Sequence, residues 1–424
     1  MVRADITHHR VDAEDARKVR QPTYFDRFRC IGADCEDTCC IGWGVPVDQE
    51  TYTKYQALSD HRIAGKPVGG LVEINPAPSS TGDYARFRLE DGKCPALHEN
   101  LCAIQQSLGE SYIPDLCSKY PRALNVLGGV VERSLHLSCP EAARLALTDP
   151  EAMVLQEREE ERLPHRPGSL NWVASDPDNQ LSRVRSLLIE LIQERSLPLW
   201  QRIVSLGFGI DRLAGVDVAS GAIVLKAHLR NVRQHSGAAF TDPKTDSAFQ
   251  LETVLDLVVA RIGTDYTSPR FLDCYRDFMQ GLEWTPESSM EDLAARYDRA
   301  TRCYFQPFAD RHPQLLENYL INYIFRTVFP YRSKLPDRRF AIDSSRESLR
   351  HAFVLLAVHY AIVRTVLVGM AAFHRNNLSI QHTVKLVQSY SKAFLHSTSF
   401  EAAAIEYLGK NLGDPARKVA ELVM

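Results

Sequence analysis

The sequence has little net charge and no strong bias toward any one class of residue. Its 424 residues include 50 Lys and Arg against 53 Asp and Glu, a formal net charge of −3. Apolar residues make up 45% of the chain and charged residues 24%, as in ordinary soluble globular proteins. This balance gives no reason to expect binding to nucleic acid or to a membrane surface. The length predicts two or three domains with ample core.

Common signatures of nucleotide and hydrolase chemistry are also missing. No G-x-G-x-x-G follows an expected strand, so nothing supports a Rossmann-type site for a dinucleotide or for S-adenosylmethionine. The phosphate-binding pattern G-x-x-x-x-G-K-[ST] and the hydrolase pattern G-x-S-x-G are absent. The familiar nucleotide-dependent and hydrolytic activities therefore have no support in the sequence.

The chain shows no secretory leader and no clear membrane span. Residues 1–20 carry both signs of charge and no apolar segment, so we expect a cytoplasmic protein whose thiols stay reduced. The stretch from His351 to His374 approaches spanning length, but His359 and Arg364 interrupt it. A mid-helix Arg costs about 2.5–3.5 kcal/mol in a membrane. We therefore predict a buried helix there.

Cysteine is the residue that the chain concentrates. Eight of its ten cysteines lie between Cys30 and Cys139. They form a dense set and a spread set, namely Cys30, Cys35, Cys39 and Cys40, then Cys94, Cys102, Cys117 and Cys139. In a cytoplasmic protein this clustering indicates a metal centre before disulfides or inert core thiols.

Four thiolates could hold a structural zinc ion or a [4Fe–4S] cluster, and the spacing does not separate the two. Zinc modules use paired C-x2–4-C knuckles separated by a loop, and Cys35-x3-Cys39 has the form of one knuckle. Adjacent side chains in extended chain point to opposite sides, so Cys39 and Cys40 should not share one zinc without a sharp turn. We favour an iron–sulfur cluster, with zinc as the alternative. The radical pattern Cys-x3-Cys-x2-Cys fails because Gly42 stands in its third position.

The loop that bears the dense set is acidic. Between Cys30 and Glu50 there are five carboxylates and no Lys or Arg. Such a patch would attract a cationic group, for example a substrate lysine. Alternatively, Asp34, Glu36 and Asp37 cap turns around a metal loop.

The fold class we predict is mainly α: an irregular cysteine-rich, metal-binding N-terminal unit with short strands, then a larger all-helical domain. The expected divisions are a polar N-terminal arm (1–23), the cysteine-rich unit (24–150), a linker (151–180) and the helical domain (181–424). Apolar residues three and four apart predict a helix beginning near residue 181. The same pattern predicts helices over 199–213, 217–234, 247–262, 289–304, 315–329, 345–373 and 380–396.

Short strands are expected within the cysteine-rich unit. Residues 87–90 read as a strand that enters a tight turn at Asp91-Gly92 and returns through Cys94. A second strand should follow Gly128-Gly129, where Val131, Leu135 and Leu137 alternate with polar neighbours.

Several motifs in the chain resemble those of a known family. They are Tyr24-x3-Phe28-x-Cys30-Ile-Gly-x2-Cys35-Glu-Asp-Thr-Cys39-Cys40-x-Gly-Trp43, Cys94-Pro-x-Leu, Leu-Cys102-x-Ile-Gln-x2-Leu-Gly-Glu110, Cys117-x2-Tyr-Pro-Arg122, Glu132-x-Ser-Leu-x-Leu-Ser-Cys139-Pro-Glu-Ala-Ala and Glu317-Asn318-Tyr-Leu-x-Asn322-Tyr-x-Phe-Arg-x2-Phe-Pro330-Tyr. They resemble motifs of the flagellin lysine-N-methylase family, and the resemblance spans most of the chain. The cysteine series is also similar to a broader group of zinc- or iron–sulfur-chelating domains.

That resemblance implies transfer of a methyl group from S-adenosylmethionine to lysine side chains of a protein such as flagellin, with an iron–sulfur cluster. It does not locate the methyl-donor pocket. Our candidates for positioning the lysine amine are Glu36, Asp37 and Glu132. The competing hypothesis is a non-catalytic protein in which a metal staples an irregular unit and the helical part binds a partner.

Overall fold

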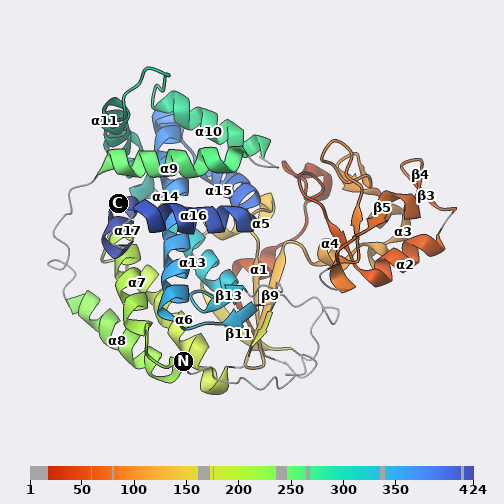
Figure 1. The fold of residues 1–424 in the computed structure, drawn as a ribbon, viewed down its shortest axis with the longest axis horizontal. Coiled ribbons are helices and arrows are strands. Elements are labelled where there is room, and N and C mark those ends of the chain that lie inside the picture. The colour runs from red at the N-terminus through yellow and green to blue at the C-terminus, as the bar shows by residue number, and fades with distance from the viewer. Residues whose placement is uncertain are drawn as a thin grey trace.

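The computed structural model describes residues 18–58, 60–78, 81–160, 172–174, 176–234, 246–263, 268–334, 340–411 and 415–424. Residues 30–120 form a small unit that projects from one side of a larger helical body (Figure 1). The two meet beside helices α4 (Asp115–Lys119), α5 (Pro140–Thr148) and α15 (Ile380–Phe394). The predicted mainly-α fold, with a smaller strand-containing N-terminal region, is confirmed.

The body is built from helices that each bury one apolar face. They are α1 (Tyr24–Arg27), α5, α6 (Gln180–Ile192), α7 (Leu199–Leu213), α8 (Val218–Gln234), α9 (Ser247–Ile262), α10 (Pro269–Gly281), α11 (Met290–Ala300), α12 (Gln306–Arg311), α13 (Gln314–Thr327), α14 (Arg346–His374), α15, α16 (Thr398–Asn411) and α17 (Pro415–Val423). A π-helical turn, Thr301–Phe305, joins α11 to α12, and short 3₁₀ turns cover Pro177–Asn179 and Arg375–Asn377.

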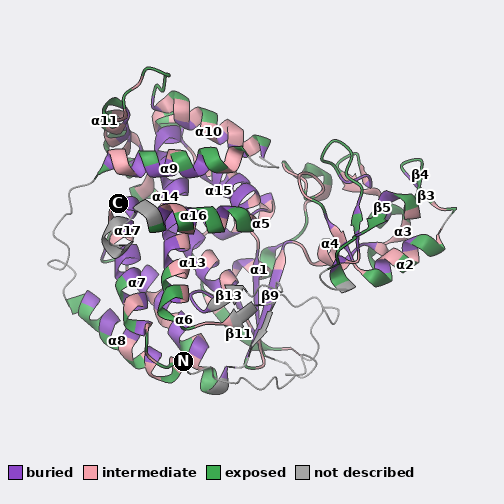
Figure 2. Ribbon diagram, viewed as in Figure 1, coloured by how far each residue is buried: buried purple, intermediate pink, exposed green. Residues whose placement is uncertain are grey.

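Helix α14 runs through the middle of the body, and buried residues follow it along its length (Figure 2). It is the one helix in the described part of the chain that is long and apolar enough to cross a membrane, but 89% of its apolar stretch is buried inside the protein. Its polar interruptions have partners: Arg364 donates to the Tyr297 hydroxyl at 2.6 Å, and His359 Nδ1 lies 2.6 Å from the Tyr390 hydroxyl. The predicted buried helix is confirmed.

Helices α10 and α14 cross in close contact because each has a glycine there. A Cβ added to Gly281 would lie 1.9 Å from the carbonyl oxygen of Gly369. One added to Gly369 would lie 2.4 Å from a ring carbon of Phe278. Only hydrogen fits at either position.

A five-stranded sheet covers one side of the body, in the order β11 (Leu155–Glu159), β1 (Lys18–Pro22), β10 (Val130–Leu135), β9 (Arg122–Leu127) and β12 (Trp172–Ala174). Strand β1 runs parallel to β10, with Val19 opposite Val131. The strand expected after Gly128-Gly129 is β10, and it forms a hairpin with β9 in which both glycines have positive φ. A second pair, β13 (Arg332–Lys334) and β14 (Phe340–Ile342), lies between α13 and α14 in the chain.

The small unit has little regular structure. Its helices are α2 (Gln49–Ala57), α3 (Ala103–Leu108) and α4, with 3₁₀ turns at Gly32–Asp34, Val68–Leu71, Thr81–Asp83 and Glu110–Tyr112. Its strands are β2 (Pro46–Val47), β3 (Arg62–Ile63), β4 (Lys66–Pro67), β5 (Val72–Ile74), β6 (Ala85–Phe87), β7 (Leu97–His98) and β8 (Leu101–Cys102). The predicted tight turn is present: Glu90 and Lys93 bond to each other, and Asp91 and Gly92 have positive φ.

The cores divide the chain at other positions than the sequence suggested. One apolar core of the small unit extends from Val45 to Ile113. Residues 122–153, expected in the cysteine-rich unit, pack instead with the helices. Of the expected arm, residues 18–22 form β1 in the sheet and residues 1–17 lie outside the described part. The expected linker contributes β11, β12 and the 3₁₀ turn Pro177–Asn179 before α6, and its residues 161–171 are likewise outside.

Candidate functional site at the junction

Acidic side chains attach the dense cysteine loop to the helical body. The Asp37 carboxylate accepts hydrogen bonds from Lys392 at 2.6 Å and from Gln388 at 2.8 Å, both on α15. Gln388 also donates to the Ser138 carbonyl at 2.9 Å. Glu36 pairs with Arg144 on α5. The loop is thereby held beside the start of α5, where Cys139 stands at the N-cap.

The eight clustered cysteines form no disulfides, and their thiols gather in two sets. In the first set the thiols of Cys40, Cys94, Cys102 and Cys117 all interact electrostatically with one another. Main-chain bonds hold part of it in place: Cys94 N–H donates to the Cys40 carbonyl at 2.8 Å, and Cys102 is paired with Leu97. In the second set, Cys139 interacts with Cys35 and Cys30.

Cys39 links the two sets and corrects one expectation. Residues 39 and 40 form a turn, so their thiols lie on the same side and are hydrogen-bonded to each other, instead of pointing apart. This contact raises the pKa of Cys39 and lowers the pKa of Cys40 to about 7. Thr38 and the nearby Lys392 ammonium also lower the pKa of Cys40. Cys40 is therefore the thiol most readily ionised near neutral pH.

The donor chemistry at this loop fits a thiolate-bound metal centre. Burial raises the pKa of Cys94 to about 12, and a bound cation would reverse that shift by favouring the thiolate. Within the described residues, however, no three Cys, His, Asp or Glu side chains stand close enough together to hold an ion. The thiols are gathered without being in coordination geometry.

Three neighbouring cavities share lining residues, and we refer to them together as the cleft; one of them is lined by both the small unit and the body, and the other two by the body. The inner end of the cleft is a cavity of about 230 Å³ lined by Cys39, Gly42, Trp43, Leu116, Lys119, Tyr120, Arg122, His136, Ser138, Lys392 and His396. Its outer end is a cavity of about 580 Å³ that includes Tyr323, Arg326, Asp343, Glu347, His351 and Glu401 in its walls. A third cavity of about 10 Å³, which we call the neck, shares Tyr323 and Arg326 with the outer end and Ser138 with the inner end. His136 and His396 line all three parts.

The neck is formed by two histidines and an arginine. The rings of His136 and His396 are 5.2 Å apart, and a guanidinium nitrogen of Arg326 lies 3.5 Å from His136 Nδ1. His396 Nε2 is 3.2 Å from the Ser138 hydroxyl, which is 3.0 Å from the Tyr120 hydroxyl. Burial and, to a smaller extent, the charge of Arg326 lower the pKa of His396 to about 4, so this ring is neutral at physiological pH.

The inner end is aromatic and cationic. The rings of Trp43 and Tyr120 are 5.9 Å apart, and the Trp43 indole donates to the Cys39 carbonyl at 2.7 Å. Arg122 lies 5.2 Å over the ring of Phe28. Desolvation lowers the pKa of Lys119. No Asp or Glu is among the described residues that line this end.

The three candidate lysine-positioning carboxylates do not lie together. Glu36 and Asp37 sit on the loop, where both are engaged by side chains of the body. Glu132 is on β10 inside the sheet, where Arg185 contacts it at 2.6 Å and both side chains are 1% exposed. None of the three lines the cleft. Their proposed role with the lysine stays a prediction.

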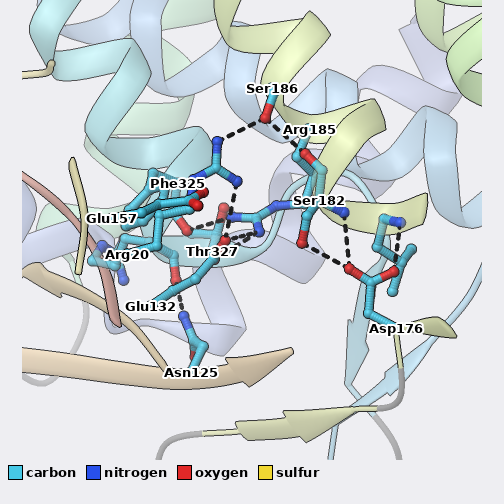
Figure 3. A network of polar contacts seen from close by, with 12 residues as sticks. Arg20, Asn125, Glu132, Glu157, Asp176, Ser182, Arg185, Ser186, Phe325 and Thr327 are labelled. Atoms are coloured by element: carbon cyan, nitrogen blue, oxygen red, sulfur yellow. Dashed lines mark hydrogen bonds and ion pairs between the residues drawn. The ribbon is translucent and has the colours of Figure 1, made fainter. Parts of the chain in front are cut away.

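Figure 3 shows the network around Glu132. Arg185 also donates to the Phe325 carbonyl at 2.8 Å, and Asn125 donates to the Arg326 carbonyl at 3.0 Å. Asp176 caps α6 by accepting from Leu181 N–H at 2.8 Å. These bonds join the sheet to α6 and to the end of α13, so the network fixes the helix that carries Arg326 into the neck.

Sequence reasoning missed His136, His396 and Arg326 as site residues. Asn322, Tyr323 and Arg326 fall on one face of the helix at i, i+1 and i+4, and this spacing of polar residues was the available signal. The two histidines stand alone in their segments, and only the fold brings them together.

The family model of the FliB lysine N-methylase C-terminal domain matches residues 185–417. The chain belongs to the FliB lysine N-methylase family. The match takes in the helices that supply Tyr323, Arg326 and Lys392 to the cleft. No solved structure matches this chain.

Curated relatives share about a third of the chain. A protein named lysine-N-methylase from Salmonella typhimurium is 36% identical over 141 residues, which are 33% of this chain and 35% of that protein. The flagellar biosynthetic protein FliU of Salmonella muenchen is 35% identical over 141 residues, 83% of its length. A lysine-N-methylase of Salmonella choleraesuis is 35% identical over 141 residues, again 35% of its length. The matched stretch thus spans about a third of the full-length lysine-N-methylases.

Proposed function

We propose that this chain is a protein lysine N-methyltransferase that uses S-adenosylmethionine and acts in the junction cleft. The observation that carries the proposal is that distant motifs contribute side chains to the same cleft. The motifs that resemble the flagellin lysine-N-methylase family lie far apart in the sequence, yet they supply Trp43, Tyr120 and Arg326 to one cleft. A shared cleft explains why the small unit and the helical body both carry motifs of the same family.

The reaction is a displacement at carbon. The lone pair of a neutral lysine amine forms the N–C bond while the C–S bond breaks and its electron pair returns to sulfur, leaving a sulfide. The amine must therefore be deprotonated and held in line with the methyl group. The neck suits this step because Arg326 and the neutral His396 disfavour an ammonium there and exclude bulk water. The lysine sheds its proton to solvent in the outer cleft.

An iron–sulfur cluster is part of the proposal, with zinc as the alternative. Cys40, Cys94, Cys102 and Cys117 would hold it, because their thiols form the more complete of the two sets. A bound cluster would supply a one-electron redox centre and fix the loop that carries Trp43. Asp37, in the same loop, holds that loop against α15 through its ion pair with Lys392.

The substrate we propose is a protein with exposed lysines, flagellin in the first instance, methylated in the cytoplasm where thiols stay reduced. The name of the FliU relative is flagellar, which supports this choice. Neither nucleic acid nor a membrane enters the proposed reaction.

One observation favours a second candidate, a non-catalytic protein stapled by a metal. The small unit has short strands and a modest core from Val45 to Ile113, so it would gain folding energy from a metal.

Two measurements test these alternatives. Anaerobic purification with iron, sulfide and zinc analysis identifies the metal, and zinc without iron removes the iron–sulfur proposal. Titration with S-adenosylmethionine and transfer of labelled methyl groups to flagellin then test the activity. Metal-replete protein that binds no donor and methylates nothing supports the stapled, non-catalytic candidate.

A further inference from the structure

The charges at the two ends of the cleft differ in sign, and this difference assigns the substrates. We propose that the methyl donor binds at the inner end, against Trp43 and Lys119, and that the lysine enters from the outer end, past Asp343 and Glu347. The inference rests on the proposed methyltransferase function and adds to it the location of both substrates.

The inner end has the groups that S-adenosylmethionine requires. The donor carries a carboxylate, an adenine ring and a sulfonium. Lys119 and Arg122 offer charge-assisted hydrogen bonds to a carboxylate, and no carboxylate of the protein lines this end in the described residues. Trp43 and Tyr120 present aromatic faces to the adenine or to the sulfonium. The cavity of about 230 Å³ is somewhat smaller than the roughly 300–1,000 Å³ of typical small-molecule sites, and it is partly open, so part of the donor would extend beyond it.

The outer end has the opposite character. Asp343, Glu347 and Glu401 stand in its walls, and Glu347 is exposed. The cavity of about 580 Å³ is wide enough for a peptide segment, whereas the inner end is not. Carboxylates at a wide opening attract a cationic side chain and repel the carboxylate of the donor, and Arg326, which also lines this cavity, borders the neck.

The neck keeps the two substrates apart until they react. Its volume of about 10 Å³ corresponds to about one water molecule, and the rings of His136 and His396 border it from both ends. A lysine chain that reaches it from the outer end meets a methyl group presented from the inner end. The lysine is captured as a cation among carboxylates and reaches the neck beside Arg326, where only the neutral amine is favoured.

A crossed experiment on the full chain, purified anaerobically, tests the assignment. The donor probe is S-adenosylmethionine, measured by calorimetric titration. The acceptor probe is a peptide with one central lysine flanked by alanines, followed by transfer of labelled methyl groups. Lys119→Gln should weaken donor binding about tenfold or more and leave the peptide KM unchanged. Glu347→Gln should raise the peptide KM about twofold to fivefold at low ionic strength, less at high salt, and leave donor binding unchanged.

Each variant has a matched control. Lys54 occupies the last turn of α2 as Lys119 occupies the last turn of α4, so Lys54→Gln should behave as the unaltered protein. Glu291 follows the N-cap of α11 by two residues, as Glu347 follows that of α14, and Glu291→Gln should have no effect on the KM. Lys119→Arg should restore donor binding, which separates loss of charge from loss of folding.

The outcomes separate the two proposals. Donor binding weakened by Glu347→Gln but not by Lys119→Gln would reverse the assignment and overturn it. No effect of either variant, with methyl transfer intact, would also overturn it while the methyltransferase function stands. Unaltered protein that neither binds the donor nor transfers methyl groups would overturn both.

Discussion

The carboxylate of Asp37 lies 2.6 Å from the ammonium of Lys392, although 355 positions separate these residues in the chain. The side chains of both are largely buried, at 13% and 9% exposed. This ion pair joins the dense cysteine loop to α15, and Lys392 also lines the inner end of the cleft. The position of the loop over the cleft therefore depends on it.

Removing the cation should loosen the small unit. Lys392→Met leaves the Asp37 carboxylate without its ammonium partner, and we expect a loss of about 2–3 kcal/mol in the free energy of unfolding. Limited proteolysis should then cut within residues 30–120 faster than in the unaltered protein. Lys385→Met is the control, because Lys385 is on the same helix and pairs with the half-exposed Asp273. Equal effects of the two variants would contradict the anchoring role.

Glu132→Gln should destabilise the body without altering donor binding. The change leaves the Arg185 guanidinium buried without its carboxylate, which costs about 3–5 kcal/mol. Urea unfolding measures the loss, and S-adenosylmethionine titration of the folded protein checks the site. An unchanged unfolding free energy combined with lost methyl transfer would support the predicted lysine-positioning role of Glu132 instead.

Stability should fall in acid because of His359. Burial lowers its pKa from 6.5 to about 3, so the unfolded chain takes up a proton first. This contribution is complete above about pH 6.5 and is lost as the pH falls toward 3, by up to about 1.4 kcal/mol per pH unit. The differences among urea midpoints at pH 7.5, 6 and 5 should be smaller in His359→Gln, which keeps a hydrogen-bonding partner for Tyr390. Part of the acid dependence should remain, because burial also lowers the pKa of His396, to about 4. In the exposed His98→Gln variant the full acid dependence should remain, and its loss there would refute the assignment.

Thiols of the first set should be required for metal. Cys117→Ser removes one of four mutually interacting donors, and we expect the iron or zinc content to fall to near zero under anaerobic conditions. Cys274→Ser should retain metal, because Cys274 is fully buried in α10 within the helical core. Cys139→Ser distinguishes the sets: retained metal places the centre on the first set, and lost metal shifts it to the second.

The crossing of α10 and α14 should tolerate no added methyl group. Gly281→Ala drives its Cβ into the Gly369 carbonyl, so we expect at least about 3 kcal/mol of destabilisation and a lower Tm. Gly409→Ala on α16 is the control, since nothing lies within 4 Å of a Cβ there. Similar melting temperatures for the two variants would mean that the helices separate easily at this point.

The helical periodicity was visible in the sequence because it is local. The expected helix over 247–262 has those bounds in α9, and the helix expected over 345–373 is α14 at Arg346–His374. Strand β1 was not visible. It has one apolar residue, Val19, and it is a strand only because β10 and β11, more than a hundred residues later, bond to its two edges.

The candidate site, too, could be predicted from the sequence only in part. The cysteine set could be read from density alone, and its place beside a cleft could not. The cleft depends on α13 and α15 reaching the loop that follows β10, which is tertiary packing between distant segments. The turn at residues 39 and 40 also escaped prediction, because the extended-chain rule applies only where the backbone is extended.

The guanidinium of Arg122 above the Phe28 ring marks the place where the chain both leaves and re-enters the body. Strand β1 precedes the exit and strand β9 follows the return, so residues 30–120 are an insertion between two strands of one sheet. A short bridge from Phe28 to Arg122 would keep the sheet closed and delete every thiol but three. Residues 30–120 are therefore a separable inserted unit, and the helical body has a continuous sheet and core without them.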